Sequence, residues 1–104
     1  SDLFKAWYKN GQLHRDNDLP AQIMADGIRK EWWINGQKHR DNDMPARIEY
    51  YRNGNKKYEG WWFDNKRHRE YDKPAYIRYF ENGNIVIDIP QTDGRYSKEV
   101  FTAK

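Results

Sequence analysis

The chain has 104 residues, of which 37% are hydrophobic and 16% aromatic, and its 19 Lys and Arg against 16 Asp and Glu give a net charge of +3. So many aromatic residues and so small a net charge exclude a disordered chain. The two signs of charge are interleaved, which favours a mixed solvated surface over a nucleic-acid or membrane footprint. Cysteine is absent from the sequence, and this excludes disulfides, thiol nucleophiles and cysteine-based zinc sites.

The sequence shows neither a membrane helix nor a signal peptide. No apolar run approaches the roughly 20 residues of a membrane helix, and residues 1–5 do not resemble the apolar part of a signal peptide. We therefore expect a cytoplasmic protein. The first repeat begins almost at residue 1, which is compatible with a piece of a longer array.

An eight-residue motif recurs along the chain and organises it. It reads His-Arg-Asp-Asn-Asp-Leu-Pro-Ala at 14–21, His-Arg-Asp-Asn-Asp-Met-Pro-Ala at 39–46 and, more loosely, His-Arg-Glu-Tyr-Asp-Lys-Pro-Ala at 68–75. Each copy follows an aromatic pair and a turn and precedes an alternating hydrophobic run. The repeating unit is therefore a whole supersecondary element, and stacked units of this size form an array in which each contacts its neighbours. We place three hairpin repeats within residues 1–89, at about 3–27, 28–56 and 57–84.

Turn signals separate the predicted strands. The first strand, at 3–9, ends at Asn10-Gly11, a dipeptide typical of the type I′ hairpin turn. Similar signals stand at 26–27, 35–36, 53–54, 64–65, 82–83 and 93–94. Because they leave no room for a long helix, the sequence predicts an all-β fold, an elongated antiparallel meander of tandem hairpins in a single domain.

The hydrophobic runs between turns alternate with a period of two. Ala46, Ile48 and Tyr50 share one face, which we predict to be the core face. The run at 75–80 repeats this pattern. The opposite face is predicted to carry Arg47, Glu49, Tyr51, Tyr76, Arg78 and Phe80.

Two tryptophan pairs, at 32–33 and 61–62, belong to the return strands. Adjacent strand residues point to opposite faces, so each pair puts one large ring on each side of the sheet. Either the loops fold back over the second face, or that face binds a partner.

Residues 85–104 leave the repeat pattern. A strand at 85–89 ends at Pro90, and a second strand is predicted at 95–101. Terminal units of arrays diverge in order to cap them, so we expect capping strands. A short helix from Ser97 is the alternative.

Residues 58–68 resemble the MORN repeat, whose pattern runs Tyr-x-Gly-x-Trp, an Asn-Gly turn and then a His. Tyr58, Gly60, Trp62 and His68 fall on these positions. The other units match less closely, because Glu31 stands in place of the Gly and Tyr8 in place of the Trp. All three copies also depart from the family where Arg and an acidic Pro-Ala loop follow the His. Over residues 3–89 the resemblance implies a ribbon of antiparallel hairpins and a role in protein association, and lipid binding has also been proposed for the family. It favours Trp33 and Trp62 inside, with Trp32 and Trp61 on the other face.

The loop motif concentrates groups that could bind metal or perform catalysis. Successive histidines are expected about 9–10 Å apart, too far to share one zinc ion, and the Asp-x-Asp pairs lack the glycine and distal Glu of a calcium loop. His-Arg-Asp also occurs in protein kinases, but there is no Gly-rich phosphate loop here and the motif recurs three times. We therefore predict a structural loop in which Asp caps amides, Arg pairs with an acid and Pro restarts the strand. Its residues are His14, Asp18, Pro20, His39, Asp43, Pro45, His68, Asp72 and Pro74.

Every distinctive feature recurs in each unit, as in a scaffold, so we predict a module without enzymatic activity, cofactor or metal that binds another protein. Its aromatic sheet face or ribbon edge would make the contact. The predicted contact residues are Trp32, Trp61, Tyr51, Phe80, Arg47 and Arg78. Open sheet edges also allow self-association. The alternative is binding of nucleic acid or another anionic polymer, including anionic lipid, through Arg and aromatic side chains. Glutamates in the same strands disfavour that alternative.

Overall fold

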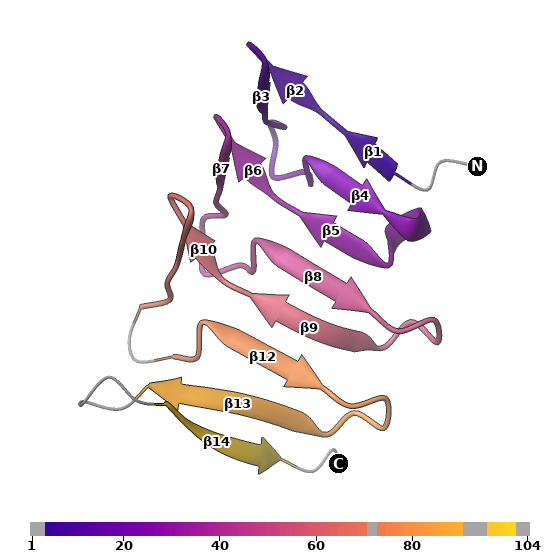
Figure 1. Ribbon diagram of the computed structural model, residues 1–104, viewed down its shortest axis with the longest axis vertical. Coiled ribbons are helices and arrows are strands. Elements are labelled where there is room, and N and C mark those ends of the chain that lie inside the picture. Colours follow the sequence, from indigo (N-terminus) through magenta and orange to yellow (C-terminus); the bar gives the residue numbers. More distant parts are fainter. Residues whose placement is uncertain (1–3, 71–72, 91–95, 102–104) are drawn as a thin grey trace.

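The computed structural model describes residues 4–70, 73–90 and 96–101, and it is built on one eight-stranded antiparallel sheet (Figure 1). The strands of this body sheet lie in nearly sequential order, β1-β4-β5-β8-β9-β12-β13-β14. They are β1 (Phe4–Ala6), β4 (Gln22–Met24), β5 (Arg29–Glu31), β8 (Arg47–Tyr50), β9 (Lys56–Gly60), β12 (Tyr76–Tyr79), β13 (Ile85–Pro90) and β14 (Tyr96–Phe101). The predicted all-β antiparallel meander is confirmed.

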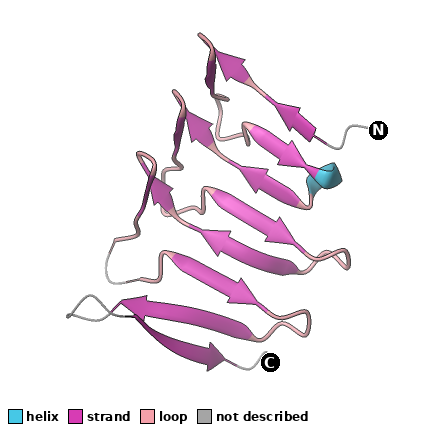
Figure 2. Ribbon diagram, in the orientation of Figure 1, coloured by secondary structure: helices cyan, strands magenta, loops and turns pink. Residues whose placement is uncertain are grey.

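Three two-stranded hairpins, here called arms, extend from one end of the body sheet. They are formed by β2 (Tyr8–Lys9) with β3 (Gln12–Leu13), β6 (Trp33–Ile34) with β7 (Gln37–Lys38), and β10 (Trp62–Phe63) with β11 (Lys66–Arg67). The only helical element within the described residues is the 3₁₀ turn η1 (Ala25–Gly27), visible in Figure 2. No helix in this part of the chain is long and apolar enough to cross a membrane.

A tryptophan stands at each corner where a body strand passes into an arm. The backbone N–H of Trp32 donates to the carbonyl of Ala46 at 2.7 Å, and its carbonyl accepts from His39 at 3.1 Å. The first bond continues the body sheet and the second closes the arm, so the backbone groups of this one residue are hydrogen-bonded in both sheets. Trp7 and Trp61 make the same pair of bonds.

The arms end in the turns that the sequence predicted. Asn35 and Gly36 both have positive φ, 49° and 79°, as a type I′ turn requires, and so do residues 10–11 and 64–65. Backbone bonds also stack neighbouring arms, since Gly36 donates to Leu13 and Asn65 donates to Lys38, each at 2.9 Å. The arms therefore form a second hydrogen-bonded layer.

The two C-terminal strands predicted from the sequence are present as β13 and β14, paired over six residues. A helix from Ser97 is therefore wrong for the segment up to Phe101, because these residues complete the edge of the sheet. The turn signal at 93–94 lies outside the described residues.

The core lies on the predicted face. Ala46 is fully buried and Ile48 is 8% exposed, and they cluster with Trp32 while Tyr50 packs against them. The overall dimensions are 40 × 33 × 20 Å, so the molecule is a flattened slab rather than a long ribbon.

Replacing Ala46 with Leu tests how closely the corner is packed. We expect the variant to lose about 1–3 kcal/mol of unfolding free energy, because added methylenes in a filled core force neighbours out of place. Urea denaturation measures the loss. Met44→Leu, at a position 41% exposed, is the matched control and should stay within about 0.5 kcal/mol of wild type. Equal stability of the two variants would contradict close packing at Ala46.

Candidate functional site

Charged and aromatic side chains gather on the sheet face opposite the core, which we call the arm-side face. Strand register aligns Glu31, Arg47, Gly60 and Tyr76 in one row. A second row on the same face contains Arg29, Glu49, Tyr58 and Arg78. With the arm residues that reach them, the arm-side face comprises Arg29, Glu31, Trp33, Lys38, Arg47, Glu49, Tyr58, Trp62, Arg67, Tyr76 and Arg78.

The arms bend toward this face and add cations to it. Lys38 of β7 lies 4.0 Å from the Glu31 carboxylate of β5 and 4.3 Å from the ring of Trp62 in the next arm. Arg67 of β11 lies over Tyr76 of β12, 5.1 Å from the ring centroid. Arm and body side chains therefore form one continuous surface.

Glu31 is the buried centre of the arm-side face. Its side chain is 6% exposed, and one oxygen accepts a hydrogen bond from Trp33 Nε1 at 3.0 Å. The other oxygen lies 3.7 Å from the Nε atoms of both Arg29 and Arg47. Both Nε atoms, and Trp62 Nε1, are buried without a hydrogen-bond partner. Buried donors left unpaired cost free energy, so the polar groups of this face are not fully satisfied.

Cations exceed carboxylates on the arm-side face, with five Lys and Arg against two Glu. Burial lowers the pKa of Lys38 below its usual 10.5, and Arg47 and two further arginines lower it more, while Glu31 raises it. A bound anion would relieve this repulsion.

Cation–π contacts arrange the outer part of the face. Arg47 lies over Tyr58 at 5.3 Å, Arg78 lies over Tyr76 at 5.4 Å, and the two tyrosine rings meet edge to face at 5.2 Å. Gly60 makes this possible, because a Cβ there would collide with the Tyr58 ring, its Cζ lying only 2.9 Å away. The glycine of the repeat therefore serves the arm-side face. In the second unit the same position holds the carboxylate of Glu31.

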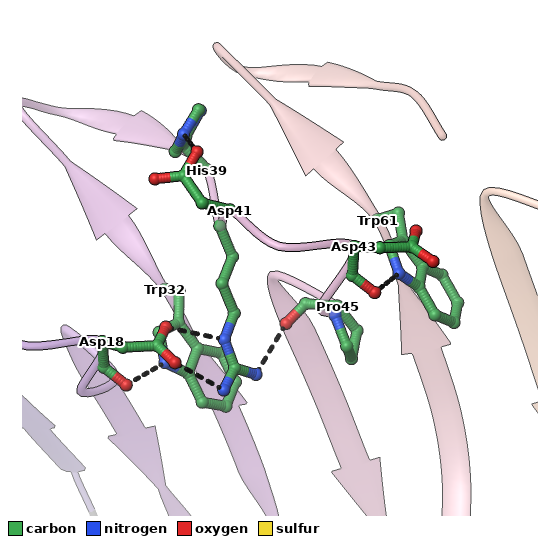
Figure 3. A network of polar contacts seen from close by, with 8 residues as sticks. Asp18, Trp32, His39, Asp41, Asp43, Pro45 and Trp61 are labelled. Atoms are coloured by element: carbon green, nitrogen blue, oxygen red, sulfur yellow. Dashed lines mark hydrogen bonds and ion pairs between the residues drawn. The ribbon is translucent and has the colours of Figure 1, made fainter. Parts of the chain in front are cut away.

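The loop motif builds a joint between successive units on the core side (Figure 3). Arg40 stacks on the corner Trp32 at 3.8 Å, and its Nε and Nη2 donate to both carboxylate oxygens of Asp18 at 2.9 and 3.2 Å. Its Nη1 donates to the carbonyl of Pro45 at 3.0 Å, and Trp32 Nε1 donates to the carbonyl of Asp18 at 3.0 Å. The tryptophan and arginine of one unit are thus held by the aspartate of the unit before it.

The next joint repeats each contact. Arg69 stacks on Trp61 at 3.9 Å and donates to both oxygens of Asp43, while Trp61 Nε1 donates to the Asp43 carbonyl at 3.0 Å. Lys73 adds a third bond to the same carboxylate. The hydrogen bond from Arg69 holds the pKa of Asp43 below its usual 3.8.

The histidines connect units within the arm layer. His39 Nδ1 accepts the backbone N–H of Asp64 at 3.2 Å, which places the proton of the neutral ring on Nε2, 2.7 Å from Asp41. His14 repeats this with Asn35 and Asp16. Each of these histidines therefore binds the turn of the next unit. The His39 ring also contacts that of Phe63, with centroids 4.4 Å apart and planes tilted by 53°. His68 is exposed and makes no such bond among the described residues.

A second type I′ turn lies inside each well-matched loop. Asn42 and Asp43 have φ of 62° and 55°, and Met44 N–H donates to Asp41 at 3.3 Å. This conformation frees the Asp43 carbonyl and carboxylate for the next unit. This turn was not predicted, although the Asn-Asp pair, which tolerates positive φ, signals it in the sequence. In the described part of the loops no Asp carboxylate caps a backbone amide, contrary to expectation, and the carboxylates accept from His, Arg and Lys instead.

The structure separates the six predicted contact residues into three groups. Arg47 and Arg78 lie on the arm-side face. Tyr51 and Phe80 lie at the opposite ends of the body strands, where the Tyr51 hydroxyl donates to the Tyr79 carbonyl and Phe80 is 50% exposed. The expectation for Trp32 and Trp61 is wrong. They are only 7% and 6% exposed, because the arginine of the loop motif covers each indole.

Trp33 and Trp62 are half-buried. Trp33 lies on the arm-side face, contrary to the expectation that it lies inside, whereas Trp62 packs against the core cluster and has Lys38 over its ring on the arm side. Lys38 and Arg67 were not predicted, since sequence alone did not show that the arms bend. Pro20, Pro45 and Pro74 accept arginine bonds through their carbonyls. Asp72 lies outside the described residues.

A cavity of about 270 Å³ lies between the second loop and the third arm, lined in part by Arg40, Trp62, His68 and Glu70. A smaller one of about 120 Å³ occupies the equivalent place one unit earlier. Within the described residues no group of three metal-ligating side chains comes together. The available chemistry is thus ion pairing, stacking and hydrogen bonding.

Comparisons with protein-family models, curated proteins and solved structures found no match for this chain.

Arg40→Lys tests the joint. Lysine keeps the charge but cannot donate side-on to Asp18 while stacking on Trp32, so we expect a loss of about 1–3 kcal/mol in unfolding free energy. Urea denaturation measures it, with Arg52→Lys at an exposed turn as the matched control. If both variants match wild type, the joint does not stabilise the fold.

Asp43→Asn tests the electrostatic part of the second joint. The pKa of Asp43 is lowered in the folded state, so its contribution is complete above pH 3.8 and is lost as the pH falls through and below that value. The difference in unfolding free energy between wild type and variant should therefore shrink on acidification. Urea denaturation from pH 7 to pH 2 checks this, and a constant difference would contradict it.

Proposed function

We propose that this protein is a non-enzymatic module that binds an acidic segment of another protein on its arm-side face. The observation that carries the proposal is the excess of cations on that face, with five Lys and Arg against two Glu. Carboxylates of a partner would pair with Arg47, Arg67 and Arg78, and its apolar side chains would contact Trp33 and Trp62.

The half-buried rings and the charged rim suit a protein interface. Tryptophan, tyrosine and arginine are the residues that most often dominate binding energy at such interfaces. Arg47 is 27% exposed and already held over Tyr58, so it loses little freedom on binding. Arg67 and Arg78 are exposed and can steer an acidic partner.

We also propose that the chain is a divergent MORN-like array of three units with C-terminal capping strands. The support is the recurrence of the corner tryptophan, the arm and the loop joint at corresponding positions. A cytoplasmic location and self-association through the edge strands β1 and β14 stay predictions.

Nucleic-acid binding is the second candidate, and the same face favours it, because Arg and aromatic side chains also bind single strands. Salt dependence separates the two. Phosphate contacts make affinity fall steeply with salt, and no binding of mixed oligonucleotides at about 50 mM salt would remove this candidate. Vesicles with anionic headgroups test the lipid version in the same way.

The proposed function is tested with a charge reversal. Arg67→Glu with Arg78→Glu should abolish binding of fluorescent Asp- and Glu-rich peptides that contain Trp or Leu. The matched control, Arg52→Glu with Lys66→Glu, changes net charge equally at exposed positions off the face and should bind like wild type. Fluorescence anisotropy measures affinity, and circular dichroism checks that both variants fold.

Equal affinity of the two charge-reversed variants would show that the arm-side face is not the binding surface. Stronger binding of oligonucleotides than of peptides, lost on adding salt, would favour the second candidate. On binding an acidic peptide, the pKa of Lys38 should rise toward its usual 10.5, which NMR titration of its side chain can follow.

A further inference from the structure

The second and third units differ at one position of the arm-side face. The second unit places Glu31 there and the third places Gly60, and strand register aligns the two residues in one row with Arg47 between them. In the second unit the carboxylate is surrounded by cations, since Lys38 lies 4.0 Å and Arg29 and Arg47 each lie 3.7 Å from its Oε2. The second unit therefore carries its own counter-charge.

The third unit keeps the surroundings of this position but places no carboxylate in it. Arm register pairs Trp62 with Arg67 just as it pairs Trp33 with Lys38. The indole Nε1 of Trp33 donates to Glu31 at 3.0 Å, whereas that of Trp62 is buried without a hydrogen-bond partner among the described residues. The third unit thus lacks the acceptor that the second unit provides for itself.

Two arginines of the third unit are left without an acid. Arg67 and Arg78 lie over the same ring, that of Tyr76, at 5.1 and 5.4 Å from its centroid, and both are exposed. Neither forms an ion pair with a carboxylate in the part of the chain that the structure describes. Because the ring contacts already restrict both side chains, they lose little freedom when an anion binds.

We propose that the third-unit subsite, made of Trp62, Arg67, Tyr76 and Arg78, binds an aspartate or glutamate side chain of the partner in the role that Glu31 has in the second unit. The proposal rests on the function proposed above and deepens it. It assigns the anchoring contact to one unit of the arm-side face. It also makes Glu31 the residue that closes the equivalent place in the unit before.

The chemistry of the subsite favours a carboxylate. A guanidinium presents parallel N–H groups that match the two oxygens of a carboxylate. The contact belongs to the exposed guanidinium groups of Arg67 and Arg78, because the Trp62 nitrogen is buried. The cations of the second unit are poorer anchors, since they share the charge of Glu31 and the Lys38 side chain is only 12% exposed.

The test locates the bound peptide by NMR on the ¹⁵N-labelled full chain, titrated with an Asp- and Glu-rich peptide that contains Leu. We expect the indole signal of Trp62 to shift and saturate, and that of Trp33 to shift much less. Arg67→Gln should weaken binding about tenfold or more, since it removes a charged hydrogen-bond partner. Arg52→Gln removes the same charge at an exposed turn off the face and should bind like wild type.

Glu31→Gln tests the other half of the proposal. The amide keeps an acceptor for Trp33 but removes the counter-charge, so the second unit becomes open as the third is. We expect the peptide to shift the Trp33 signal as well and to bind several-fold more tightly. Glu81→Gln changes net charge equally at an exposed turn and is the matched control. Circular dichroism checks folding, and the Arg67→Gln comparison decides the proposal without Glu31→Gln if that variant does not fold.

Several outcomes would overturn the proposal while leaving the proposed function intact. They are equal shifts of the Trp33 and Trp62 signals in wild type, unchanged affinity of Arg67→Gln, or Glu31→Gln binding no more tightly than Glu81→Gln. Tighter binding of inorganic phosphate than of the peptide at the Trp62 signal would show a phosphate site instead. If wild type binds no acidic peptide at all, the proposed function is wrong and the subsite with it.

Discussion

The stack of an arginine on each corner tryptophan is the interaction on which the rest of the structure depends. The tryptophan backbone belongs to both the body sheet and the arm, so its position sets the angle between them. Its indole is buried by a side chain of its own unit, and its N–H is satisfied by the unit before. Packing and polar satisfaction thus come from different units. A single unit does not supply both, so neighbouring units complete each other's contacts.

This arrangement also explains how a chain with few aliphatic residues forms a sheet with one packed face and one charged, aromatic face. The corner tryptophans and the loops cover the core side of the sheet, where the buried Glu59 is paired with Tyr79 and Lys56. The second tryptophan of each pair goes to the opposite side, where Glu31 is approached by more cations than it can neutralise. Among the described residues no buried polar side-chain atom on the core side lacks a partner, whereas Arg29 and Arg47 on the arm-side face each keep an unpaired donor. That asymmetry is the basis for proposing the arm-side face as the binding surface.

Periodicity predicted much of the fold, because strands and type I′ turns are local properties. Alternation in residues 46–51 located the core face, and Asn35-Gly36 located an arm turn correctly. The same alternation shows that Trp32 and Trp33 oppose each other but not which is buried, since that depends on the bend at the corner and on Arg40 covering one ring. Lys38 and Arg67 joined the candidate site through the same bend. The sequence predicted that the arginine of the loop motif pairs with an acidic residue, but not that Arg40 pairs with Asp18 of the preceding unit. That pairing depends on a left-handed turn, which is set by two consecutive positive φ angles.

The three units are similar in sequence but differ in what surrounds them, and the surroundings decide their roles. Arg15, Arg40 and Arg69 each stack on a tryptophan and bind a proline carbonyl, so the guanidinium is held in place before any aspartate is considered. In the second and third units the aspartate comes from the preceding loop and the result is stability. In the first unit the same held guanidinium has no aspartate partner among the described residues. Each guanidinium is thus positioned by its own unit, and the aspartate of the preceding loop completes the joint in the second and third units.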